Sequence, residues 1–172
     1  VVSAQLVLKT GSGANPTDKP GLANFTVATI DEGTSSRNAL QIADEVAQLG
    51  GSLTTNSTMD ASQATISSLQ RNFPQMLDLL ADVVRRPNFP AEEVERQRAS
   101  RLASLVQQRE NANAVATTVM YAALYGQSHP YGYTELGTEA SNKALNRDDL
   151  QKFWSQNFVP NNAALIVSGR IS

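Results

Sequence analysis

The sequence of 172 residues contains no cysteine and only one histidine, His129. Without cysteine the chain cannot form disulfides, use a catalytic thiol or ligate a metal through sulfur. A single histidine also excludes a metal site that takes two imidazoles from this chain. No apolar run approaches the roughly 18 residues that a membrane span requires. These absences remove most metal and thiol chemistry from consideration.

A strong excess of charge of one sign is also missing. The sequence has 14 Lys and Arg against 16 Asp and Glu, a formal net charge of −2. This balance excludes nucleic-acid binding by a strongly basic surface. Hydrophobic residues make up 41% of the chain, enough for a sizeable core, and the length fits one domain. No basic-then-apolar signal segment begins at Val1, so we expect a processed form or a piece of a longer protein.

Alternating and helical apolar patterns predict an α+β fold. A period of two predicts a strand at Val2, Ala4, Leu6 and Leu8 and a hairpin over residues 52–58 and 61–69, and a short apolar run predicts a last strand over 163–168. Apolar spacings of three and four predict six helices between the strands. The first is short and contains Leu22, Phe25, Thr29 and Ile30, and the second is capped by Ser35 or Ser36 and turns Leu40, Ala43, Val46 and Ala47 inward. The others run from Phe73 to Val84, after Pro90, over a segment with Val115, Val119, Ala122 and Ala123 inward, and after a cap formed by Asn146 and Asp149. This order favours an antiparallel or mixed sheet with helices packed on one face.

The candidate catalytic groups each have a simpler structural interpretation. His129 has no Gly-x-Ser-x-Gly nucleophile elbow to serve, so we interpret it as a turn residue that bonds to nearby backbone. Adjacent acidic pairs such as Asp31 and Glu32 do not face one another on a helix. The arginines of the helix after Pro90 are predicted to form a salt-bridged solvent face with Glu93 and Glu95; they are Arg96, Arg98 and Arg101.

Several segments, taken in order, resemble the pitrilysin/insulinase family of zinc metallopeptidases, which includes the mitochondrial processing peptidase. They span nearly the whole chain, and their order and spacing carry the resemblance. The segments are residues 21–25 (Gly-Leu-Ala-Asn-Phe), 31–34 (Asp-Glu-Gly-Thr), 49–53 (Leu-Gly-Gly-Ser-Leu), 77–84 with 87–89 (Pro-Asn-Phe), 129–132 (His-Pro-Tyr-Gly) and 160–169. The resemblance implies the α+β metallohydrolase fold of that peptidase, with residues 1–172 as a single domain trimmed at both ends.

The resemblance also implies that the zinc site is lost. Active members read Gly-Leu-Ala-His-Phe-x-Glu-His, in which the histidines bind zinc and the glutamate activates water. Here Asn24 stands at the first histidine, Val27 at the glutamate and Ala28 at the second histidine. The region expected to hold a distant glutamate ligand, residues 102–108, contains no acid. We therefore predict no catalytic residues, no metal ligands and no cofactor in this chain.

In this family a zinc-bearing half is paired with a metal-free half of the same fold. The resemblance therefore implies that this chain is the metal-free wall of a peptide-degrading chamber, with zinc in a partner domain or subunit and a peptide as substrate. A structural scaffold with no role in proteolysis is the alternative, and a hydrolase that acts through His129 is a third. The family's substrate-clamping residues lie downstream of Ser172. The pattern favours a bacterial periplasmic or secreted setting.

Overall fold

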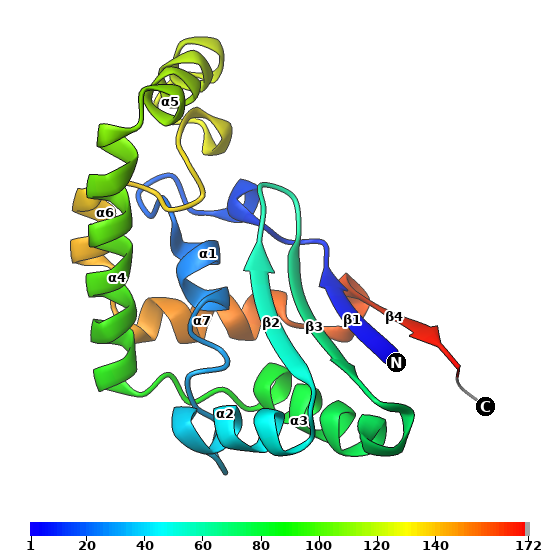
Figure 1. Cartoon of the computed structure of the whole chain (residues 1–172). Helices are drawn as coiled ribbons and strands as arrows, with labels where there is room; N and C mark the ends of the chain where they lie inside the picture. Colours follow the sequence, from blue (N-terminus) through cyan, green and yellow to red (C-terminus); the bar gives the residue numbers. More distant parts are fainter. Residues whose placement is uncertain (171–172) are drawn as a thin grey trace.

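Four antiparallel strands form the sheet of the computed structural model, which describes residues 1–170 (Figure 1). The strand order is β2-β3-β1-β4, with bounds β1 Val2–Leu8, β2 Ser52–Ser57, β3 Ser62–Ser68 and β4 Ala163–Gly169. Ala4 in the middle of β1 lies opposite Ile66 of β3 and Val167 of β4. All four predicted strands are present: β1, β2 and β3 were predicted from alternation and β4 from its apolar run.

Seven α-helices accompany the sheet in the described residues: α1 Leu22–Val27, α2 Ala39–Gln48, α3 Phe73–Arg85, α4 Ala91–Glu110, α5 Ala112–Tyr125, α6 Glu139–Ala144 and α7 Arg147–Asn157. The α+β prediction is confirmed. We did not predict the six-residue α6, which is too short to show an apolar period.

The core lies between the helices and one face of the sheet. Ala4 and Ile66 of the sheet pack against Met76 and Leu80 of α3. A second cluster centres on Phe25 of α1 and joins it to α3, α4 and α7; it includes Leu22, Leu79, Val83, Phe89, Val94, Leu150 and Phe153. Short α1 is thus fixed between α4 and the sheet (Figure 1).

The predicted cap of α2 and part of its predicted inward face are wrong. The cap of α2 is Asn38, whose side chain accepts a hydrogen bond from the Gln41 backbone, and not Ser35 or Ser36, since the Ser36 hydroxyl bonds to Asp82 instead. Leu40 of α2, predicted to face inward, is 69% exposed. Val46, also predicted to face inward, packs against both core clusters, so the pattern identified the helix and only part of its buried face.

Helix α5 differs from its prediction more strongly. None of its residues is buried, and Val119, predicted to face inward, is 62% exposed. The helix lies at the far end of α4, away from the sheet (Figure 1). Because α5 is apolar on every side, its sequence could not indicate which face packs.

Candidate functional site

The candidate site lies at α1, which starts from a backbone turn that only glycine accommodates. Gly21 precedes the helix with a φ of 87°, in the left-handed region. A Cβ atom added there would lie 2.5 Å from the carbonyl oxygen of Leu136. The Asn15 side chain accepts a hydrogen bond from the Ala23 amide at 2.8 Å. These contacts place the first turn of α1 against the segment around Leu136.

The three residues predicted to stand at former zinc positions follow on α1. Asn24 is half-buried, Val27 is buried, and Ala28 is half-buried at the C-terminal cap. Val27 and Ala28 carry no donor atom, so the amide of Asn24 is the one metal-ligating group among them. Among residues 1–170, no group of three His, Cys, Asp or Glu side chains could hold a metal ion.

The Asn24 amide is itself engaged. Its Oδ1 accepts a hydrogen bond from Arg101 Nη1 of α4 at 2.6 Å, and its Nδ2 donates to the Ser57 carbonyl at 3.4 Å. A metal ion at this place would meet two apolar side chains and an oxygen already bound to a positive group. The residues present at α1 therefore do not fit zinc.

Arg101 is the functional-site residue that the sequence interpretation missed. Its side chain is 4% exposed and donates to neutral oxygens: Nε to Asn142 Oδ1 at 2.7 Å, Nη1 to Asn24, and Nη2 to the carbonyls of Gly21 at 3.2 Å and Leu136 at 3.0 Å. Its Cζ atom lies 4.8 Å from the ring centroid of Phe25. Burial lowers the pKa of Arg101 to about 10, so the guanidinium stays charged at neutral pH.

The predicted salt bridges of α4 are correct for two of its three arginines, but only Arg96 lies on a solvent face, since the Arg98 side chain is 14% exposed. Arg96 pairs with Glu93 at 2.6 Å, and Arg98 pairs with Glu95 at 3.0 Å. Arg101 instead follows the buried Val94 by seven residues, two helical turns, and so lies on the inward face. That spacing is the signal that would have identified it.

An acidic pair lies just beyond α1. Burial raises the pKa of Asp31 to about 6, and the charge of Glu32 adds to the effect. Hydrogen bonds from its own backbone and from Thr55, together with the charge of Arg96, oppose the rise only in part. Glu32 is bound by Arg96 at 2.5 Å. Glu32 is therefore already engaged in an ion pair with Arg96.

His129 lies in a turn, as predicted. Its Nδ1 accepts a hydrogen bond from the Tyr131 backbone amide at 3.1 Å, and its ring stacks on Tyr125 with 5.5 Å between centroids. The bond that the structure gives this imidazole is therefore to backbone and not to a serine hydroxyl.

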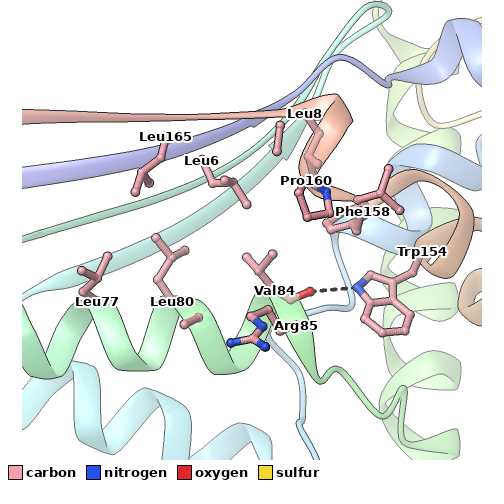
Figure 2. Close-up of a pocket in the computed structure, with 13 residues that line it drawn as sticks. Leu6, Leu8, Leu77, Leu80, Val84, Arg85, Trp154, Phe158, Pro160 and Leu165 are labelled. Carbon is pink, nitrogen blue, oxygen red and sulfur yellow. Dashed lines mark hydrogen bonds between the residues drawn. The ribbon is translucent and has the colours of Figure 1, made fainter.

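A groove of about 570 Å³ lies elsewhere, between α3, the C-terminal end of α7, and strands β1 and β4 (Figure 2). Leu77, Leu80 and Leu6 point into it, and Trp154 Nε1 beside it donates to the Val84 carbonyl at 2.9 Å. Its lining is apolar apart from Arg85 and includes no residue of α1 or α4. The groove thus offers no catalytic group.

The fold and the residues of α1 define a peptidase-like α+β domain whose described residues offer no set of zinc ligands. The sequence pattern of the insulinase family of peptidases (peptidase family M16) matches residues 1–139. The chain belongs to this family, and the resemblance read from the sequence is confirmed.

Three similar proteins set the chain in context. It is 30% identical to the alpha subunit of the mitochondrial-processing peptidase of Solanum tuberosum, over 79% of this chain and 27% of that protein. It is 25% identical to an uncharacterized zinc protease of Rickettsia bellii, over 99% of this chain and 41% of that protein. The crystal structure of a peptidase M16 inactive domain from Pseudomonas fluorescens superimposes with a TM-score of 0.93 at 26% identity. The match covers 99% of this chain and 42% of that one. The chain thus spans less than half the length of these relatives. No helix in residues 1–170 has the length and apolarity to cross a membrane.

Proposed function

We propose that residues 1–172 form one non-catalytic M16-type domain, which builds the metal-free wall of a peptide-degrading chamber with a zinc-bearing partner domain or subunit. The observation that carries the proposal is the α1 site, where Asn24, Val27 and Ala28 leave a single amide and Arg101 occupies it. The similarity to a domain described as inactive supports the loss of chemistry. The similarity to one subunit of a processing peptidase supports a partner.

The sheet supports a role in holding peptide. Strand β2 is the outer strand of the order β2-β3-β1-β4, so one of its edges has no strand beside it in the described residues. An extended peptide can add to such an edge through main-chain hydrogen bonds. Asn24 donates to the carbonyl of Ser57, the last residue of β2. A peptide on this edge would therefore run toward α1 without meeting a metal.

Metal content and peptidase assays test the proposal. We expect the purified chain to bind less than about one tenth of an equivalent of zinc and to cleave no fluorogenic peptide library. Adding a zinc-bearing M16 subunit from the same organism should give cleavage that a chelator abolishes. The control is that subunit alone. Stoichiometric zinc with chelator-sensitive cleavage by this chain alone would refute the proposal. A fully active subunit that the chain neither binds nor stimulates would favour a scaffold.

Peptide binding at β2 is tested with backbone-modified ligands. Because strand addition uses main-chain hydrogen bonds, N-methylation at alternate residues of a bound peptide should weaken its binding by more than about tenfold. The matched control is the same peptide with its side-chain order scrambled and its backbone unchanged. Equal losses for the two peptides would contradict addition to the strand edge.

A further inference from the structure

We propose that Arg101 is a built-in cation that takes the place of a metal at α1: it holds together the segments that meet there and keeps the site closed to metal ions. The inference rests on the proposed function in treating α1 as a former metal site. It goes beyond the loss of ligands, because it predicts that restoring ligands alone will not restore metal binding.

The first support is the convergence of oxygen atoms on one guanidinium. Two are backbone carbonyls, from Gly21 and Leu136, and both bind the same Nη2 atom at 3.2 and 3.0 Å. The other two are the side-chain oxygens of Asn24 and Asn142. These acceptors are dipoles with their negative ends directed at one point, which is the environment that a cation requires.

The second support is the tight backbone packing behind those carbonyls. Cβ atoms added at Gly21 and Gly137 would lie 2.5 Å from the Leu136 oxygen and 2.3 Å from the Pro20 oxygen. The two loops therefore approach each other through backbone alone, with Arg101 binding a carbonyl from each. Asn142 Nδ2 also donates to Leu136 O at 2.7 Å. The guanidinium thus cross-links α1, α4, α6 and the segment before α6.

The third support is the charge around the site. The Arg101 guanidinium has no carboxylate among its bonds, and Arg98 lies nearby, with its Cζ 5.5 Å from the same Phe25 ring. Arg98 is neutralised by Glu95, whereas Arg101 keeps its charge within a few ångströms of Asn24. A divalent ion at position 24 would be repelled at short range in a poorly solvated place.

Zinc binding to paired histidines tests the closed site. Histidines at positions 24 and 28 lie four residues apart on one helix face and can chelate zinc. We expect the N24H/A28H variant to bind zinc at least about 100-fold more weakly than N24H/A28H/R101M, as measured by titration calorimetry. The control pair A116H/M120H, on exposed α5, should bind zinc equally with Arg101 or Met at position 101. Equal affinity at α1 with and without Arg101 would overturn the closed site.

Chemical rescue tests the cross-linking role. Arg101→Ala should melt at least about 5 °C lower than the wild type, and millimolar ethylguanidinium should restore part of the loss, since its planar fork fits the same oxygens. Ethylammonium should restore less. Arg109→Ala, whose side chain is 64% exposed, should show no rescue. An unchanged melting temperature for Arg101→Ala, or equal rescue of both variants, would contradict this role. If R101A does not fold, Arg101→Lys, which keeps the charge without the fork, carries the same test.

These outcomes are separate from those of the proposed function. All zinc and rescue measurements use the isolated chain, whereas partner-dependent cleavage uses the pair. A wild-type chain that binds zinc would refute the proposed function, and an open site in N24H/A28H would refute only the role of Arg101.

Discussion

At the scale of single residues, Asp82 of α3 is the carboxylate that binds the polar side chains of the segment before α2. It is fully buried; its Oδ2 accepts hydrogen bonds from Thr34, Ser36 and Arg37 at 2.7–2.8 Å, and Arg86 lies 2.8 Å from Oδ1. Burial raises the pKa of this carboxyl, but the hydrogen bonds and the charge of Arg86 outweigh burial and lower it.

Asp82→Asn should lower the free energy of unfolding by about 1.5–3 kcal/mol at pH 7, because the two arginines and two hydroxyl groups lose a charged acceptor. Since the folded pKa is lowered, the wild type has this stability above the unfolded value of 3.8 and loses it as the pH falls below that value. Urea unfolding at pH 7 and pH 3 measures the difference. Asp78→Asn, at an exposed position of the same helix, is the control and should be near neutral.

Asp31 should show the opposite pH dependence. Its folded pKa of about 6 lies above the unfolded value of 3.8, so its favourable contribution is complete below about pH 3.8 and is lost as the pH rises through 6. Asp31→Asn removes the loss and should be more stable than the wild type at pH 7 by up to about 3 kcal/mol. Melting temperatures from pH 4 to pH 8 test this. A difference in melting temperature between Asp31→Asn and the wild type that does not grow with pH would contradict this expectation. The control Asp44→Asn, at an exposed position, should melt at the same temperature as the wild type throughout.

At the scale of elements, the capping box of α7 contributes to the stability of the fold independently of the core. Asn146 Oδ1 accepts from the Asp149 amide, and Asp149 Oδ2 accepts from the Asn146 amide, each at 3.1 Å. Asn146→Ala should destabilise the chain by about 1 kcal/mol, since the Asp149 amide in the first turn loses its side-chain acceptor. Gln156→Ala, exposed on the same helix, controls for the substitution. Equal effects of the two changes in urea unfolding would argue against the cap.

Helix α5 should be the least protected helix of the isolated chain. It has no buried residue, whereas α3, nearly as long, buries six. Local opening is easiest where few side chains are buried. Hydrogen exchange followed by mass spectrometry should therefore show α5 amides exchanging at least about tenfold faster than α3 amides. Equal protection would mean that α5 is covered in the isolated chain.

These elements show which features a sequence can specify. Strands β1 and β3 and helix α3 were predictable because each has a buried face that repeats locally. The absence of zinc ligands and of a general base at Asn24, Val27 and Ala28 was inferred from the resemblance to the family, by the positions of these residues in its motif. The burial of Arg101 was not predicted, because it depends on carbonyls of Gly21 and Leu136, which lie 80 and 35 residues away along the chain. Long-range backbone contacts of this kind leave no local pattern.

At the scale of the whole molecule, the chain has the α+β architecture of the M16 peptidase family. The fold positions α1 between the sheet and α4, and α4 supplies a permanent positive charge at that place. On the function proposed above, the partners that the domain binds and the peptide that its sheet edge holds would matter more than the residues of α1.

The outer strands carry a cost for solubility. Neither β2 nor β4 contains a charged residue or a proline, and β4 turns Leu165 and Ile166 toward solvent. Charges and prolines are the usual protection against fibre growth along a ribbon of unpaired amides. Within residues 1–170, β2 and β4 each have one edge with no strand beside it, so we expect copies of the concentrated protein to associate through these edges unless a bound neighbour covers them.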